Sequence, residues 1–152
     1  MKYEIGNKLK QLNSMLSEVD NLYQTLLKAH NVSEGEYIVM FAINELGEGC
    51  SQKDISENGY ASKKTINSTI KKFEKDGHIE LRPAKYPSMQ IFLTEKGKKF
   101  MKENIVPILQ VESNVLDDVP ENEFEALAQC YRKHLSAFRS HVEKYIKNKS
   151  AQ

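Results

Sequence analysis

The stretch SKKTINSTIKKFEKDGHIELR (residues 62–82) combines a helical repeat of apolar residues with a run of positive charge. At about 100° per residue, Ile66, Ile70 and Phe73 fall on one narrow arc of a helix and predict its buried face. A serine at position 62 and a glycine at position 77 are typical of a helix start and a helix end. We therefore predict one amphipathic helix between Ser62 and Gly77.

The outer face of this helix has an unusual charge pattern. Soluble helices usually mix both signs of charge in Glu–Lys pairs four residues apart, but the first acid inside this helix is Glu74. The preceding turns present cations, hydroxyls and an amide, which are the groups that contact phosphates and base edges. The candidate DNA-contacting residues of the helix are therefore Lys63, Lys64, Thr65, Asn67, Ser68, Lys71 and Lys72.

The net charge of the 152-residue chain is only +1, but the charge is unevenly distributed. Residues 51–100 carry eleven Lys/Arg against six Asp/Glu, whereas residues 1–50 carry four against seven and residues 101–152 carry seven against eight. A local field of this kind acts on a polyanion even when the whole chain is nearly neutral. The distribution favours nucleic acid as the partner of the middle third.

Two shorter segments precede the basic helix. VSEGEYIVMFAINELGEG (residues 32–49) opens with a capping box formed by Ser33 and Glu36, and Gly47 predicts its end. Its expected buried residues are Tyr37, Ile38, Phe41 and Leu46. CSQKDISENGY (residues 50–60) repeats the signal with Ser51 and Asp54 and predicts a helix of about two turns. Two short capped helices with a tight connection, the second more basic, are typical of a helix-turn-helix.

After Gly77 the apolar period changes from helical to alternating. Ile79 and Leu81, and then Ile91 and Leu93, lie at two-residue steps with RPAKYPS between them. The pattern predicts a hairpin of two short strands. We expect Arg82, Lys85 and Tyr86 at its tip, where Arg82 and Lys85 are candidates for a second DNA contact.

Long amphipathic helices are predicted on both sides of this region. They cover roughly residues 3–29, residues 94–119 with a kink or break at Pro107, and a final helix that begins near Pro120 with its apolar stripe between Phe124 and Tyr145. The predicted fold class is mainly α with a small β-hairpin wing, that is, a winged helix-turn-helix with long N- and C-terminal helices.

This order of elements resembles the MarR family of winged helix-turn-helix transcription regulators across essentially the whole chain. The most specific pieces are KFEKDGHI (residues 72–79), at the end of the basic helix, and LTEKG (residues 93–97), after the wing. The family's wing usually carries an Asp–x–Arg motif. The corresponding positions of this chain read Lys85, Tyr86 and Pro87.

The resemblance implies a single domain over residues 1–152, with dimerisation helices at 1–32 and 100–152 and a winged-helix lobe at 33–99. It also implies a homodimer whose recognition helices enter the major grooves of a palindromic operator on double-stranded DNA. By position, Ser62, Thr65, Asn67 and Ser68 fall where the family's recognition helix meets DNA, and Gln52 falls on the preceding helix.

The expected function is a cytoplasmic, ligand-responsive transcription regulator, most simply a repressor. A small-molecule effector in the crevice beside the winged-helix lobe would change the spacing of the two recognition helices. Leu16, Tyr37, Met40 and Phe41 are candidate pocket residues because they are large and apolar, although core packing is the default role of each. Two rivals remain: a winged-helix protein-interaction module with an acidic partner, and a redox sensor that acts through Cys50 or Cys130.

Other functional classes find little support in the sequence. No nucleophile–base pair, paired carboxylates or glycine-rich phosphate loop stands out, so an enzyme is not expected. His134 and His141 share a helix face, but interface or solvated histidines are the default there, and we expect neither a metal nor a cofactor. No apolar run reaches the roughly 18 residues of a membrane span. Two widely spaced cysteines fit a reducing compartment.

Overall fold

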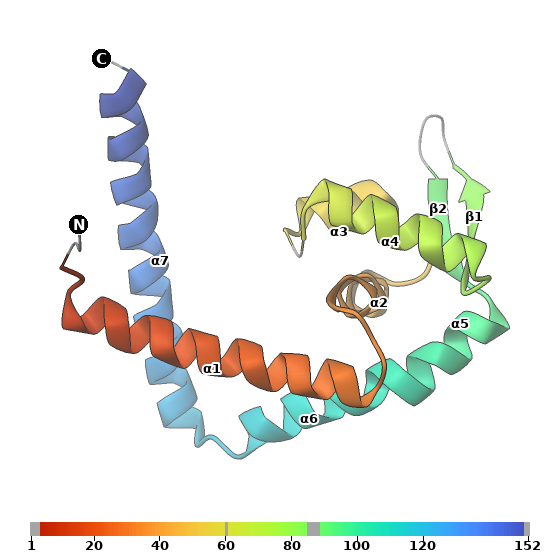
Figure 1. Cartoon of the computed structure of the whole chain (residues 1–152), viewed down its shortest axis with the longest axis horizontal. Helices are drawn as coiled ribbons and strands as arrows, with labels where there is room; N and C mark the ends of the chain where they lie inside the picture. The colour runs from red at the N-terminus through yellow and green to blue at the C-terminus, as the bar shows by residue number, and fades with distance from the viewer. Residues whose placement is uncertain (1–3, 60, 85–88, 151–152) are drawn as a thin grey trace. The chain divides into compact units, whose positions relative to one another are not determined.

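The computed structural model describes residues 4–59, 61–84 and 89–150 (Figure 1). The chain forms two compact units, Met1–Leu109 and Gln110–Gln152. Its elements are α1 (Asn7–Ala29), α2 (Glu34–Leu46), α3 (Gln52–Glu57), α4 (Lys63–Lys75), β1 (Ile79–Pro83), β2 (Met89–Leu93), α5 (Glu95–Phe100), a π-helical segment (Met101–Ile105), α6 (Val106–Asp117) and α7 (Glu121–Ser150). The predicted fold class, mainly α with a small β-hairpin, is confirmed. The predicted single-domain organisation stays a prediction.

Both predicted capping boxes are present. The Ser33 hydroxyl accepts from the backbone N–H of Glu36, and the Glu36 carboxylate accepts from the backbone N–H of Ser33. Ser51 and Asp54 make the same reciprocal pair at the start of α3. Each box satisfies N–H groups that a helix start leaves without intrahelical partners. The starts of both helices are therefore set by local sequence.

The buried face of α2 differs from the predicted one. Leu46 is 38% exposed, and Tyr37, Ile38 and Phe41 are only half-buried. The buried apolar residues of α2 are Val39, Met40, Ala42 and Ile43. The prediction was wrong because residues 37–43 are all apolar, so their pattern defines no single face. Packing against other elements selects the face instead, and α2 contacts both α3 and α4.

The hairpin forms as predicted, with Ile79 opposite Leu93 and Leu81 opposite Ile91 in an antiparallel pair. A short segment before α3 extends this sheet. The backbone N–H of Gly49 donates to the carbonyl of Ile91 at 2.8 Å, and the N–H of Ile91 donates to the carbonyl of Cys50 at 2.9 Å. The wing is thereby held against the start of the helix-turn-helix.

The two motifs KFEKDGHI and LTEKG meet at the junction of α4, the wing and α5. The Thr94 hydroxyl donates to the carbonyl of Gly77 at 2.7 Å, and the Thr94 N–H donates to the carbonyl of His78 at 3.0 Å. The same hydroxyl caps α5 by accepting from the N–H of Gly97 at 3.0 Å. A Cβ on Gly97 would overlap the His78 carbonyl, so only glycine fits there.

The helix that contains Pro107 does not break. The chain passes from α5 through the π-helical segment directly into α6. Proline lacks a backbone N–H and its ring collides with the carbonyl four residues earlier. A π-helical stretch just before the proline is a known way to absorb such an irregularity, so the expected interruption takes this form.

The two terminal helices leave apolar side chains in solvent. In α1, only Leu27 is buried, and Leu9, Leu16, Val19 and Leu22 are between 45% and 61% exposed. In α7, none of residues 121–150 is buried. Its exposed apolar residues are Phe124, Leu127, Tyr131, Leu135, Phe138, Val142, Tyr145 and Ile146.

Candidate nucleic-acid interface

Helix α4 divides cleanly into a buried face and a charged face. Ile66, Ile70 and Phe73 are at most 3% exposed, which confirms their predicted place in the core. The Ser62 hydroxyl caps the helix by accepting from the N–H of Thr65 at 3.1 Å. The helix ends at Lys75 and is followed by Gly77 at a φ of 73°, a backbone conformation that favours glycine.

Four lysines on α4 are available to an external anion. Lys63, Lys64, Lys71 and Lys75 are exposed, and no carboxylate in the described part of the chain lies within 4.0 Å of their ammonium groups. Asn67 and Ser68 are also exposed on this helix. A surface with unpaired cations and short polar side chains matches the chemistry of phosphates and base edges.

Two of the predicted contact residues are engaged inside the chain. The Lys72 ammonium lies 2.8 Å from a carboxylate oxygen of Glu36 on α2, so its charge is already paired. Thr65 is half-buried, and its side chain faces Gly35 on α2. The sequence placed both residues on the flanks of the helix, but it did not reveal that α2 covers one of those flanks.

The hydroxyls of Ser62 and Ser68 also have local partners. Ser62 lies 2.8 Å from the Thr65 hydroxyl, and Ser68 donates to the Thr65 carbonyl at 2.9 Å. Both serines are exposed, and the Ser68 hydroxyl, which donates this bond, keeps its acceptor lone pairs. They remain candidates for DNA contact at the start and middle of α4.

The wing departs from the prediction at Arg82. This residue lies within β1 opposite Gln90 rather than at the hairpin tip. Its guanidinium pairs with Glu80 and lies 4.2 Å from the centroid of the Phe92 ring. Much of its charge is therefore satisfied within the wing. Lys85, the other predicted wing contact, and its neighbour Tyr86 lie outside the described residues.

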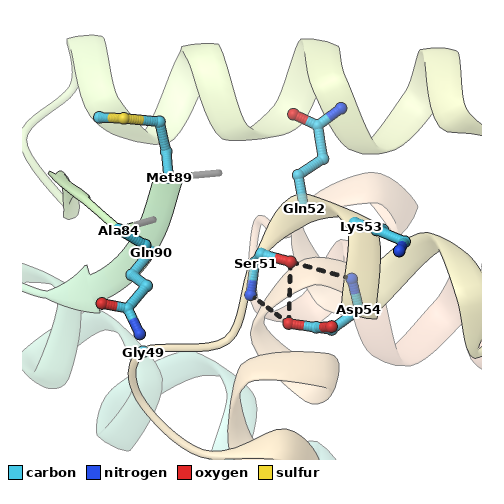
Figure 2. Close-up of a pocket in the computed structure, with 8 residues that line it drawn as sticks. All are labelled: Gly49, Ser51, Gln52, Lys53, Asp54, Ala84, Met89 and Gln90. Atoms are coloured by element: carbon cyan, nitrogen blue, oxygen red, sulfur yellow. Dashed lines mark hydrogen bonds between the residues drawn. The ribbon is translucent and has the colours of Figure 1, made fainter. Parts of the chain in front are cut away.

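Gln52 lies at the start of α3, and together with Lys63 at the start of α4 it lines a small hollow. It also borders a hollow of about 670 Å³ between α3 and the wing, which Figure 2 shows together with the Ser51–Asp54 capping box. The lining residues are Gly49, Ser51, Gln52, Lys53, Asp54, Ala84, Met89 and Gln90. Gln52 and Gln90 place amide groups on opposite walls of this hollow, one from the helix and one from β2.

One of the four predicted effector residues, Tyr37, borders a hollow. A hollow of about 360 Å³ lies between α1 and α2, and its lining residues are Asp20, Tyr23, Gln24, Leu27, Glu34, Tyr37 and Ile38. Tyr37 is the one predicted pocket residue in this lining. Met40 is fully buried in the core, and Leu16 is 45% exposed on α1. The Phe41 ring is tilted by 42° against the Tyr37 ring, with ring centroids 6.0 Å apart. Leu16, Met40 and Phe41 do not line this hollow, and their contact with an effector stays a prediction.

Cys50 is buried in the core, next to the start of α3. Burial and, to a lesser degree, the nearby Asp54 carboxylate raise the pKa of its thiol. Because the thiolate is the reactive form, a raised pKa and a buried position both make Cys50 a poor oxidation sensor. Cys130 is exposed on α7. Its remaining feature is its place beside Tyr131 in the apolar stripe.

The described residues form neither a metal-binding cluster nor a membrane-spanning helix. Within residues 4–59, 61–84 and 89–150, no three His, Cys, Asp or Glu side chains gather in an arrangement that holds a metal ion. His134 instead stacks on Phe138 with ring centroids 6.2 Å apart. Over the same ranges, every helix is too short or too polar to cross a bilayer.

No protein-family model and no curated protein matches the sequence, but solved structures match the fold closely. A MarR family regulator from Neisseria meningitidis is 20% identical with a TM-score of 0.68, covering 87% of this chain and 99% of its own. The chain has the fold of the MarR regulators. PcaV from Streptomyces coelicolor, solved with its natural ligand, is 14% identical with a TM-score of 0.67, and the match covers 89% of this chain and 99% of PcaV. MepR from S. aureus, solved with DNA, is 18% identical with a TM-score of 0.64, and the match covers 89% of this chain and 99% of MepR.

Proposed function

We propose that the protein is a sequence-specific, DNA-binding transcription regulator that acts as a homodimer, binds a palindromic operator and responds to a small ligand as a repressor. The observation that carries the proposal is α4 in this MarR fold. It buries its apolar face against its own lobe and leaves Lys63, Lys64, Lys71 and Lys75 without carboxylate partners among the described residues. MepR, which shares the fold, is found on DNA.

Homodimerisation is supported by the exposed apolar side chains of α1 and α7. Contiguous apolar patches of this kind are rare on monomers and typically mark an interface. A two-fold dimer presents the same surface on both chains and thus two copies of α4 to a symmetric operator. Response to a ligand is supported by the hollow between α1 and α2, together with the ligand that PcaV carries in its structure.

Titration of duplex DNA at several salt concentrations tests the proposal. Lysines that neutralise phosphates release counterions, so the affinity should fall steeply with salt. Lys64→Ala and Lys71→Ala should each reduce the slope of log affinity against log salt by about 0.9. Lys147→Ala, which removes a charge from the last turn of α7, serves as the control and should leave the slope unchanged.

Two outcomes of this titration would reject DNA binding. The first is no retention of any genomic fragment at low salt. The second is a salt slope that is unchanged in Lys64→Ala and Lys71→Ala but reduced in Lys147→Ala. If the protein instead captured an acidic polypeptide in competition with DNA, the rival protein-interaction function would be favoured.

A further inference from the structure

The first turn of α2 lies directly on the recognition helix. Thr65, Thr69 and Lys72 are spaced four and three residues apart, so they form one stripe along α4. A Cβ on Gly35 would come within 2.7 Å of the Thr69 hydroxyl oxygen and 3.4 Å of a Thr65 methyl carbon. Only a glycine at position 35 allows α2 to approach the stripe this closely.

The next residue, Glu36, completes the contact through its carboxylate. One oxygen accepts from the backbone N–H and the hydroxyl of Ser33, at 2.8 and 2.7 Å. The other lies 2.8 Å from the Lys72 ammonium. The Glu36 side chain is only 12% exposed, so it is a largely buried charge with both oxygens occupied. Such a charge is stable in the interior only while its partners remain in place.

The protonation behaviour of the pair agrees with this geometry. Burial raises the pKa of the Glu36 carboxyl, but the hydrogen bonds from Lys72 and Ser33 outweigh burial and hold the pKa below its usual range. The same contact raises the pKa of Lys72. Both groups are therefore charged at neutral pH, and Lys72 has an anionic partner inside the chain before any DNA arrives.

We propose that Glu36 is a positioning residue that acts through Lys72. The pair fixes the rotation of α4 about its axis, and the Lys72 ammonium neutralises Glu36 rather than a DNA phosphate. The inference rests on the proposed DNA-binding function and adds the device that orients its reading surface. Gly35 sets how close α2 and α4 lie. The buried Ile66, Ile70 and Phe73 define the inner face of α4, and the Glu36–Lys72 pair holds the helix at that rotation.

This role has a specific signature in DNA binding. Contacts to base edges depend on the rotation of α4, because each residue turns the helix by about 100° and a small rotation displaces Asn67 and its neighbours. Contacts from long lysines to phosphates tolerate such a displacement. Loss of the pair should therefore lower the affinity for a specific site more than the affinity for random DNA.

The experiment compares Glu36→Gln, Lys72→Gln, the double variant and Lys72→Arg with the wild type. The probes are the tightest duplex selected by the wild-type protein from a random pool and a random-sequence duplex of the same length. Glu36→Gln and Lys72→Gln should each reduce the ratio of specific to random affinity by about tenfold, and the double variant by no more than either one. Lys72→Arg, which can still pair with Glu36, should retain the ratio.

The salt slope separates positioning from direct phosphate contact. Lys72→Gln should leave the slope unchanged, whereas the control Lys71→Gln, on the exposed face one residue away, should reduce it by about 0.9. A slope reduced by the same amount in Lys72→Gln would overturn the inference. So would additive effects of the two single variants, because independent residues add and a coupled pair does not.

Amide hydrogen exchange of α4 reports positioning without DNA. Glu36→Gln should speed exchange over residues 63–75 and leave α7 unchanged, and equal protection in variant and wild type would overturn the inference. If the wild type bound no duplex, the proposed function would fail, while faster exchange in α4 would still support the positioning role. Should Glu36→Gln not fold, Lys72→Gln and Lys72→Arg provide the same comparison.

Discussion

Helices α4 and α7 have similar amphipathic patterns but use them in opposite ways. The 13-residue α4 buries Ile66, Ile70 and Phe73 within its own lobe and leaves its cations in solvent. The 30-residue α7 has no buried residue over 121–150, and large residues such as Phe138 and Tyr145 are more than 60% exposed. The apolar face of α4 is buried by neighbouring elements, whereas the apolar side chains of α7 are exposed among the described residues.

The difference teaches that an apolar stripe predicts a buried face without saying what buries it. For α4 the partner is α2, α3 and β1, which contact it directly. For α7 the apolar side chains remain available for a second copy of the chain. Changes at the junction that anchors α4 and on the exposed face of α7 test whether the two helices differ in this way.

The largest effect is expected at the junction that anchors α4. Gly97→Val should destabilise the protein by about 3 kcal/mol, because the new side chain collides with the His78 backbone and cannot move aside. The midpoint of urea unfolding measures the effect. Gly6→Ala is the control, because nothing in the described structure lies within 4 Å of a Cβ added there; it should cost less than about 1 kcal/mol. Equal losses in both variants would show that the junction is not tight.

The next effect concerns the free face of α7. Leu135→Glu combined with Phe138→Glu should convert a dimer into a species of the 17.5 kDa chain mass, since each apolar side chain buried in an interface contributes about 1.5–3 kcal/mol. Light scattering after size-exclusion chromatography measures the mass. Gln129→Glu with Ser136→Glu adds the same charge to the opposite side of the helix and should leave the dimer intact. A wild-type monomer would contradict the proposed use of this face.

A smaller effect is expected from acid on the contact between α2 and α4. The folded-state pKa of Glu36 is lowered from its ordinary value of 4.5, so its stabilisation is present above that value and is lost as the pH falls through the lowered pKa. The free energy of unfolding should therefore decrease less between pH 7 and pH 3 in Glu36→Gln than in the wild type. Glu34→Gln, an exposed change in the same turn, is the control. If the free energy of unfolding fell equally with pH in all three proteins, Glu36 would not be the group responsible for the loss of stability in acid.

The smallest effect is expected from the cysteines. Replacement of both Cys50 and Cys130 by serine should leave the response of DNA binding to peroxide unchanged, because burial raises the pKa of the Cys50 thiol and keeps it protonated. A gel-shift titration with and without peroxide measures the response. A peroxide effect that is present in the wild type and absent in the variant would revive the redox-sensor function.

Local signals in the sequence predicted much of this structure. The capping pairs Ser33–Glu36 and Ser51–Asp54 each lie within four consecutive residues, so they could be predicted from local sequence alone. The buried face of α4 was predicted because its apolar residues are few and evenly spaced. The hairpin was predicted because its apolar residues alternate with a period of two, which is the period of a strand.

Features that depend on contacts between distant residues were not predictable. The buried face of α2 was misassigned because residues 37–43 are uniformly apolar and packing chose the face. The sequence does not distinguish Lys72 from the other exposed lysines, because its partner Glu36 lies 36 residues earlier and only the fold brings the two together. Likewise, the effector residues were predicted because they are large and apolar, and those properties do not show that Tyr37 borders the hollow between α1 and α2 whereas Met40 is buried in the core.

The sequence by itself therefore determined the helices, their caps, the hairpin and the cationic character of α4, because each depends on neighbours within a few turns. Only the tertiary structure decided which of those cations remain free. All of these lysines are exposed, but Lys64 and Lys71 have no carboxylate partner among the described residues, whereas Lys72 neutralises the largely buried Glu36. The reason is physical: a charge has a partner only if the fold brings one within a few ångströms, and residue spacing along one helix cannot report what another helix places beside it.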